Sequence, residues 1–323
     1  MQTISVYFNQ RASQGGAQFW KDKIGQSLFR SELLFRSPED LDELAVNLKE
    51  DLTSKVDAIV SVGGDGTVNT LIQEMANKEV GLLVVPGGTA NDLANELGNE
   101  KNINRVISRI RSKEIKKIDL IKVNNRYMAT NGGIGFAGDV ASKVNRLRKK
   151  FPVFKKVMGM AGRKIYPLFA MQELLGLDLK YNDLYIDSPD FKGQVHAAAV
   201  LVNNQSMIGG TFNVAPETRN DDGKFNVCIV THPTRHELLT CLYRLSMGES
   251  LDKDPHFISF ETDQVTIKNL KPANKVNFFG DGEVFEDSQE QIWNVSIENQ
   301  ALNVFTKCSE KDLVDLVNEV TLE

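Results

Sequence analysis

Hydrophobic residues in the first third of the chain follow two alternating patterns. Short apolar runs, typical of buried strands, occupy residues 4–9, 32–36, 58–62 and 80–85. After the last three runs, apolar residues recur every three or four positions, which predicts one buried helix face each time. These faces comprise Leu41, Leu44, Ala45 and Leu48, then Val68, Leu71, Ile72, Met75 and Ala76, and then Ala90, Leu93, Ala94 and Leu97. Strands that alternate with helices predict an α/β domain with a mainly parallel sheet.

The start of the first of these helices is predicted from local sequence. Ser37 is a preferred N-cap residue, and Pro38 after it suits the first helical position. Acidic residues follow at once, where the helix dipole favours them. We therefore expect this helix to begin at Ser37.

The pattern changes after about residue 116, where short β-rich segments replace the alternation. Residues 117–123 and 126–130 flank Asn124-Asn125, which predicts a tight hairpin. Further strands are predicted at residues 195–202, 225–230, 264–267, 276–279, 293–297 and 302–306. This spacing favours a second domain of mostly antiparallel sheet.

Two domains follow from the change of pattern. We expect the α/β domain at residues 1–118 and the β-rich domain at residues 119–306. Leu313, Leu316 and Val320 predict a short C-terminal helix. We expect this segment, residues 307–323, to pack back on the first domain.

Composition and charge narrow the class of protein. Of 323 residues, 41% are hydrophobic and 25% are charged, which is typical of a globular protein and excludes collagen-like and disordered chains. Lys and Arg number 38 against 43 Asp and Glu, and the net charge of −5 argues against general binding of nucleic acid. Cys228, Cys241 and Cys308 have no CxxC spacing, which predicts reduced thiols in the cytoplasm. Neither a membrane-spanning run nor a secretory signal is recognisable.

Two glycine-rich turns follow the third and fourth predicted strands. They are Gly63-Gly64-Asp65-Gly66-Thr67 and Gly87-Gly88-Thr89-Ala90-Asn91-Asp92. Ligands of an open parallel sheet bind beyond the carboxyl ends of its strands, and glycine lets backbone N–H groups approach an anion at the helix N-termini that follow. The turns therefore predict a phosphate site, with Thr67 and Thr89 as hydroxyl donors. The simpler alternative is two tight strand-to-helix turns.

An acid inside a phosphate-binding turn needs a separate explanation, because a carboxylate repels phosphate. Asp65 and Asp92 occupy such positions. We expect them either to hold Mg²⁺ through water or to fix loop amides by hydrogen bonding.

Other nucleotide and metal signatures are weak. The sequence has no P-loop pattern. Gly133, Gly135 and Gly138 match G-x-G-x-x-G, but the acid that a dinucleotide-binding fold needs about 20 residues later is missing. His232 and His236 form the one close histidine pair, and Pro233 between them argues against a metal site.

The two turns are the first of a series of motifs that continues through the chain. They read GGDGTVN at residues 63–69 and PGGTAND at residues 86–92. Later motifs are NGGIGFAGDV at residues 131–140, Asn203-Asn204, Gly209-Gly210, Ala215-Pro216, Asp222-Gly223 and Asp281-Gly282-Glu283. In this order they resemble the diacylglycerol kinase catalytic family, which includes bacterial lipid kinases and sphingosine kinases. NAD kinases and phosphofructokinases share GGDGT, but the later motifs separate the lipid kinases from both.

The resemblance implies a phosphofructokinase- or NAD-kinase-like first domain that binds ATP and a second domain that binds the lipid. The nucleotide contacts that it implies are Gly63, Gly64, Asp65, Gly66, Thr67, Val68 and Asn69 in the first loop, with Gly88, Thr89, Asn91 and Asp92 in the second. Asp281 and Glu283 would supply the general base that takes the proton of the lipid hydroxyl. A structural Mg²⁺ is implied at Asp222, with the carbonyls of Arg219 and Lys224.

Two positions depart from the family pattern. Residues 9–16 replace an Asn-Pro and a Ser-Gly that usually follow the first strand, and Asn95 stands where an Arg is common. The first difference affects nucleotide contacts of that loop, and the second affects a contact near the phosphates. Neither touches the implied base.

The two acids of the last motif can also be interpreted from their chemistry. A lipid alcohol needs an acceptor for its proton, which contributes about 10²–10⁴ in rate. On an extended strand Asp281 and Glu283 would face the same side, whereas on a tight turn they need not. Two carboxylates that share a site raise the pKa of one, which suits a base. The alternative is a surface turn with two solvated acids.

A basic and apolar segment lies at residues 140–172. Its basic residues are Lys143, Arg146, Arg148, Lys149, Lys150, Lys155, Lys156, Arg163 and Lys164, and its apolar residues include several Phe and Met. This composition predicts peripheral contact with an anionic membrane surface. The alternative is a solvated helix face over ordinary core.

We therefore expect a cytoplasmic, peripherally membrane-associated lipid kinase of phospholipid biosynthesis that uses ATP and Mg²⁺. Its acceptor would be diacylglycerol or a related lipid alcohol, and the sequence leaves the lipid and a homodimer open. A small-molecule kinase of the NAD kinase type is the second hypothesis. A non-catalytic module that binds lipid or nucleotide is the third.

Overall fold

The computed structural model describes residues 2–8, 17–28, 30–88, 91–136, 180–208, 212–285 and 289–306. The chain divides into two compact units. One contains Met1–Ile118 and Gln300–Glu323, and the other contains Asp119–Asn299.

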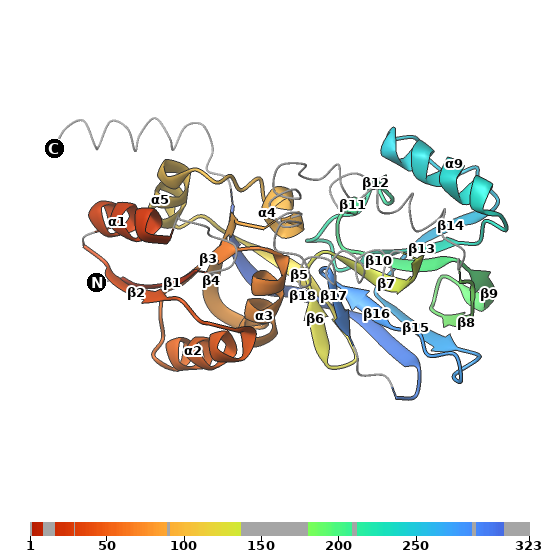
Figure 1. Ribbon diagram of the computed structural model, residues 1–323, viewed down its shortest axis with the longest axis horizontal. Helices are drawn as coiled ribbons and strands as arrows, with labels where there is room; N and C mark the ends of the chain where they lie inside the picture. The colour runs from red at the N-terminus through yellow and green to blue at the C-terminus, as the bar shows by residue number, and fades with distance from the viewer. Residues whose placement is uncertain are drawn as a thin grey trace. The chain divides into compact units, whose positions relative to one another are not determined.

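The first unit is built on a parallel sheet with the strand order β2-β1-β3-β4. Its strands are β1 (Thr3–Phe8), β2 (Glu32–Arg36), β3 (Ala58–Gly63) and β4 (Lys78–Pro86). Its helices are α1 (Ala17–Ser27), α2 (Leu41–Thr53), α3 (Asp65–Met75), α4 (Asp92–Glu96) and α5 (Ile103–Ser112). Figure 1 shows α1 and α5 on one face of the sheet and α2 and α3 on the other. Every residue of β3 is buried, as a strand covered on both faces requires. The predicted α/β class is confirmed.

Helix α2 begins later than predicted, because a different residue caps it. Asp40 is the N-cap residue, and its side chain accepts a hydrogen bond from the Glu43 backbone N–H at 2.9 Å. The Glu43 side chain in turn accepts from the Glu39 backbone N–H at 2.7 Å. The prediction of Ser37 as the cap is therefore wrong.

A buried carboxylate ties α2 to the first two strands. Asp51 is 1% exposed and accepts hydrogen bonds from the Tyr7 hydroxyl at 2.6 Å and from Arg36 Nη2 at 2.5 Å. Burial acts to raise the pKa of Asp51, but the hydrogen bonds from Arg36 and Tyr7 outweigh it and hold the pKa below its ordinary value. Asp51 therefore stays ionised inside the unit.

The second unit is formed by antiparallel strands. Its strands are β5 (Ile115–Val123), β6 (Arg126–Met128), β7 (Asn131–Gly135), β8 (Asn182–Asp187), β9 (Lys192–Ala197), β10 (Ala199–Asn203), β11 (Met207–Ile208), β12 (Phe212–Asn213), β13 (Phe225–Val230), β14 (Phe257–Thr262), β15 (Gln264–Asn269), β16 (Phe278–Gly280), β17 (Glu283–Phe285) and β18 (Ile292–Phe305), of which β5 and β18 continue into the first unit. One sheet has the order β14-β13-β10-β7-β16-β17, and β18, β15, β8 and β9 pair in a second series. Apolar side chains from both, among them Val200, Phe278, Ile267 and Trp293, share one core cluster. The predicted antiparallel β-rich part is confirmed.

Two strand predictions in this part are wrong. The apolar run 195–202 is split between β9 and β10, which pair with different neighbours, because the chain changes partners at Ala198. The predicted strands 293–297 and 302–306 are one strand, β18, whose first half pairs with β15 and whose second half pairs with β4. Residues 300–306 belong to the first of the two compact units. The hairpin at Asn124 is confirmed, because Val123 pairs with Arg126.

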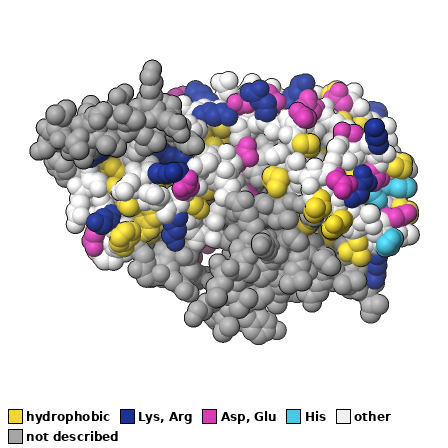
Figure 2. All heavy atoms as spheres, turned by 90° about the horizontal axis from the view of Figure 1, so that it is seen from above, with side chains coloured by type: hydrophobic (Ala, Val, Ile, Leu, Met, Phe, Trp, Pro, Cys, Tyr) yellow, Lys and Arg dark blue, Asp and Glu magenta, His cyan; other side chains and the backbone are white. Residues whose placement is uncertain are grey.

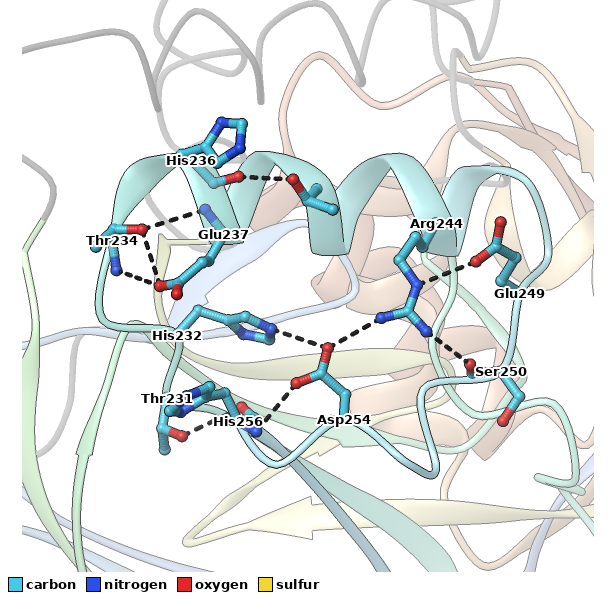
Figure 3. Close-up of polar contacts among 11 residues, drawn as sticks. Thr231, His232, Thr234, His236, Glu237, Arg244, Glu249, Ser250, Asp254 and His256 are labelled. Atoms are coloured by element: carbon cyan, nitrogen blue, oxygen red, sulfur yellow. Dashed lines mark hydrogen bonds and ion pairs between the residues drawn. The ribbon is translucent and has the colours of Figure 1, made fainter.

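Helix α9 (Arg235–Ser246) packs on the apolar residues of β10 and β13. Thr234 and Glu237 form a capping box at its start, which satisfies two backbone donors. Near its end, Arg244 Nη1 donates to Asp254 Oδ2 at 3.1 Å. Figure 3 shows His232 directed toward Asp254, whereas His236 points away from it.

Candidate functional site

The two glycine-rich turns of the first unit lie in direct backbone contact. Gly63 and Pro86 pair at the carboxyl ends of β3 and β4, and the Gly87 N–H donates to the Gly63 carbonyl at 2.7 Å. A Cβ atom on Gly64 would lie 3.0 Å from the Gly88 Cα, and one on Gly88 would lie 2.6 Å from the Gly64 Cα. The turns therefore need glycine for their contact with each other, before any ligand is considered.

Asp65 holds the two turns together. Its carboxylate accepts hydrogen bonds from the backbone N–H groups of Asn91 at 3.1 Å and Asp92 at 2.8 Å. Asn91 has a φ of 52°, and its Oδ1 accepts from the Gly88 N–H at 2.7 Å. Of the two roles expected for Asp65, the structure shows the fixing of loop amides.

The residues of the first turn differ in what they present to solvent. Gly64, Asp65 and Gly66 are half-buried at the start of α3, where the first backbone N–H groups of a helix have no partner within the helix. Thr67 is only 2% exposed, and a Cβ on Gly63 would lie 2.7 Å from its Oγ1. The Thr67 hydroxyl thus packs behind the turn, and the surface of the turn that can receive an anion is main chain.

Other nucleotide-loop residues have structural partners. Val68 and Asn69 are buried. Asn95, at the position where the family commonly has Arg, donates from Nδ2 to the Asn91 carbonyl at 2.5 Å. Thr89 lies outside the described residues. Asn95 therefore supports the second turn instead of extending toward a phosphate.

Asp281 and Gly282 form the two-residue turn of a hairpin between β16 and β17. Their φ values are 51° and 78°, and Gly280 pairs with Glu283 across the turn. Positive φ at both central positions is the geometry of a type I′ turn. The turn interrupts the strand, so the extended i, i+2 relation of Asp281 and Glu283 does not apply.

The carboxylate of Asp281 is bound to the chain that follows β6. It accepts hydrogen bonds from the Ala129 N–H at 3.0 Å, the Thr130 N–H at 2.8 Å and the Thr130 hydroxyl at 2.6 Å. Asp281 is 8% exposed, so the alternative of two solvated acids is wrong for it. Glu283, the first residue of β17, is half-buried. The two acids therefore have different environments.

The glycines of β7 serve strand packing. Gly133 has a φ of 143°, and a Cβ there would lie 2.1 Å from the Val200 carbonyl oxygen. A Cβ on Gly135 would lie 2.3 Å from the Ala198 carbonyl oxygen, and one on the neighbouring Gly132 would lie 2.4 Å from the Phe279 carbonyl oxygen. The G-x-G part of the G-x-G-x-x-G pattern is thus explained by close strands on either side, and Gly138 lies outside the described residues.

The turn at residues 219–224 is where the resemblance implies Mg²⁺. Asp222 is exposed, and its Oδ1 accepts from the Lys224 N–H at 3.2 Å, while Arg219 Nε donates to Asp221 at 3.0 Å. Across the described ranges, no three His, Cys, Asp or Glu side chains gather as metal ligands. One carboxylate with main-chain carbonyls is an all-oxygen donor set, which fits Mg²⁺ that keeps several waters.

Sequence reasoning gave no role to the polar residues that support these turns. Asp119 is fully buried, its Oδ2 accepts from the Gly223 N–H at 2.8 Å, and its own N–H donates to the Asn220 carbonyl at 2.7 Å. Thr130 and Asn204 are buried beside the Asp281 hairpin. The available signal was polar residues inside or beside apolar strands, as in Ile118-Asp119-Leu120.

Several predictions lie outside the described residues. They concern the departure from the family pattern at residues 9–16, the proposed membrane segment at residues 140–172, the Gly209-Gly210 pair and the C-terminal segment 307–323.

Known proteins resemble the chain over most of its length. Residues 4–123 match the diacylglycerol kinase catalytic domain, and residues 135–306 match the YegS C-terminal NAD kinase beta sandwich-like domain. A diacylglycerol kinase of Bacillus subtilis (strain 168) is 26% identical over 236 residues, which cover 72% of this chain and 74% of that protein. A diacylglycerol kinase of Staphylococcus carnosus (strain TM300) is 24% identical over 242 residues, which cover 74% of this chain and 75% of that protein.

Solved structures extend the likeness to the fold. The crystal structure of a diacylglycerol kinase from Bacillus anthracis str. Sterne matches with a TM-score of 0.70 at 18% identity, and the match covers 95% of this chain and 97% of that one. The motifs at residues 63–92 lie in the region that matches the first domain, and the motifs at residues 203–283 lie in the region that matches the second. The chain therefore belongs to the diacylglycerol kinase catalytic-domain family, with a C-terminal domain of the YegS type.

Proposed function

We propose that the protein is an ATP- and Mg²⁺-dependent kinase that transfers the γ-phosphoryl group to the hydroxyl of a membrane lipid. The observation that carries this proposal is the contact of Gly64 with Gly88, which joins two main-chain turns at the carboxyl ends of adjacent parallel strands. That position is where such sheets bind ligands. Family membership and relatives named diacylglycerol kinases support a lipid acceptor over a small molecule.

The proposed role of the first unit is to hold the phosphates of ATP. Phosphoryl transfer has a loose transition state with its charge on the phosphoryl oxygens, so catalysis is mostly positioning and electrostatic stabilisation. The main chain of residues 63–66 would donate N–H groups to these oxygens at the start of α3. Asp65 would keep the second turn in place beside the first.

The proposed roles of the two acids follow from the hydrogen bonds of Asp281 and from the position of Glu283 beside the turn. Asp281 already accepts hydrogen bonds from Ala129 and Thr130, so it would hold the hairpin. Glu283, two positions later and half-buried, would accept the proton of the lipid hydroxyl. Asp281 is thus a positioning residue in this proposal, and Glu283 is the catalytic base.

Magnesium would act in two places. Bound with ATP, Mg²⁺ neutralises charge that develops on the phosphates. Asp222, with the carbonyls of Arg219 and Lys224, would hold the structural ion that the resemblance implies.

Access to the lipid would come from the membrane surface. No helix in the described parts of the chain is both long and apolar enough to cross a bilayer. On the face drawn in Figure 2, basic and acidic side chains of the described residues are interspersed. By their composition, residues 140–172 would supply the attraction to an anionic membrane. Co-sedimentation with anionic and with neutral vesicles tests this, and binding that is absent or insensitive to salt would contradict it.

Incubation with labelled ATP tests the proposed reaction. Total lipid extract and NAD are offered as separate acceptors, and the labelled product is identified. We expect label in a phosphorylated lipid. Label in phosphorylated NAD would favour a small-molecule kinase, and no labelled product would favour a non-catalytic module.

A further inference from the structure

Asn204 is a fully buried polar residue directly after β10. All of its N–H groups donate to main-chain carbonyls. Its Nδ2 donates to Asp119 O at 2.9 Å and to Ala129 O at 3.0 Å, and its backbone N–H donates to Thr130 O at 2.8 Å. Because both side-chain partners are carbonyls, the amide nitrogen must face them, which fixes the orientation of the side chain.

The peptide group between Ala129 and Thr130 lies between Asn204 and Asp281. Its carbonyl oxygen accepts from Asn204 Nδ2 at 3.0 Å, and its N–H donates to Asp281 Oδ1 at 2.8 Å. A peptide group is planar, so a bond that orients the carbonyl also orients the N–H on the opposite side. Hydrogen bonds at both ends of one peptide also polarise it and strengthen each other.

We infer that Asn204 is a positioning residue for the Asp281 hairpin, acting through the 129–130 peptide. The effect of Asn204 on turnover rests on the proposed function, whereas its effect on the hairpin does not. The second hydrogen of Nδ2 orients the carbonyl of Asp119, whose carboxylate binds Gly223 in the 219–224 turn. Binding both carbonyls requires two N–H donors on one nitrogen. Asparagine has these two donors, whereas serine and aspartate lack them.

Hydrogen exchange of the full-length chain tests the inference directly. In Asn204→Ala, we expect the amides of Ala129 and Thr130 to exchange about tenfold faster, the factor that corresponds to one lost hydrogen bond. Asn204→Ser retains one donor, so it should give a smaller increase in the exchange rate of these amides. It replaces the alanine variant if that variant does not fold.

Asn303 offers a matched control. It is 5% exposed, and its Nδ2 donates to two main-chain carbonyls, Lys78 O at 3.3 Å and Glu79 O at 2.9 Å. Asn303→Ala should lower stability while leaving exchange at 129–130 unchanged. Unchanged exchange at 129–130 in Asn204→Ala, or an equal increase in the control, would overturn the inference.

Kinetics separate this inference from the proposed function. If the wild-type chain phosphorylates lipid, Asn204→Ala should lower kcat by about tenfold or more with KM for ATP nearly constant, because one hydrogen bond to the hairpin support is lost. The pH dependence of kcat should also shift, which a general loss of stability would not cause. If the wild type has no activity, the proposed function fails and the exchange result still decides the role of Asn204.

Discussion

The Asp281 carboxylate accepts two hydrogen bonds from Thr130, one from its backbone N–H at 2.8 Å and one from its hydroxyl at 2.6 Å. These two residues are far apart in sequence, and their contact fixes the hairpin that carries the DGE motif. A carboxylate with this many donors is suited to holding structure. The two acids of the motif should therefore respond differently to substitution.

Asp281→Asn should lower both stability and activity. The substitution places an amide among donors that bind the carboxylate, so the free energy of unfolding should fall by about 1–3 kcal/mol. Urea unfolding measures this loss. Thr130→Val should lower stability as well, and the two changes together should cost less than the sum of the single changes, because they share one contact. Strict additivity would contradict the contact.

Glu283→Gln should lower activity by far more than it lowers stability. Loss of a general base lowers kcat by about 10²–10⁴, and KM for ATP should stay unchanged. Lipid phosphorylation and thermal unfolding measure the two effects. Glu261→Gln is the control, because Glu261 is an exposed acid on the edge strand β14 that pairs only loosely with Lys224, at 3.7 Å. Full turnover in Glu283→Gln would remove the assignment of the base.

Asp65→Asn should weaken ATP binding, because the second turn loses its anchor. Hydrogen bonds to a charged group contribute about 1.5–3 kcal/mol each, so the Kd for ATP should rise at least about tenfold. Calorimetric titration measures the Kd. Asp57→Asn is the control, since Asp57 also accepts from a backbone N–H, that of Thr3 at 2.7 Å. An equal rise in both variants would show that the effect is not local.

Gly88→Ala should also weaken ATP binding. Its Cβ would lie 2.6 Å from the Gly64 Cα, so the two turns must separate. Gly25→Ala in α1 meets no atom within 4 Å and should stabilise the helix by up to about 1 kcal/mol. Nucleotide titration and thermal unfolding of both variants check these opposite effects, and a Gly88→Ala chain with normal affinity would be inconsistent with the turn contact.

Stability should depend on pH through Asp51. Its pKa is lower in the folded chain than in the unfolded chain, because the hydrogen bonds from Arg36 and Tyr7 outweigh burial. The unfolded chain therefore binds the proton more readily, so this contribution is complete above the unfolded pKa of about 3.9 and is lost as pH falls below it. The free energy of unfolding, measured in urea from pH 6 down to about 3, should fall less steeply with pH in Asp51→Asn than in wild type.

The alternation of apolar runs predicted the first unit well, because its strands are buried on both faces and leave a clear pattern. It failed at Ala198, where a continuous apolar run hides a change of strand partner. The motifs located both loops and the hairpin. They could not give the role of Asp281, because its partners Ala129 and Thr130 are set by tertiary contact and not by spacing. Asn204 belonged to the motif series, but its role could not be predicted, because its partners Asp119 and Ala129 are likewise set by tertiary contact.

Transfer of the γ-phosphoryl group of ATP to a lipid hydroxyl can be decided by comparing two acceptors. Total lipid extract is used as acceptor, either native or after acetylation of its hydroxyl groups, with labelled ATP and Mg²⁺. We expect label in a lipid of the native extract and none in the acetylated extract. Equal labelling of both extracts, or no labelling of either, would contradict it.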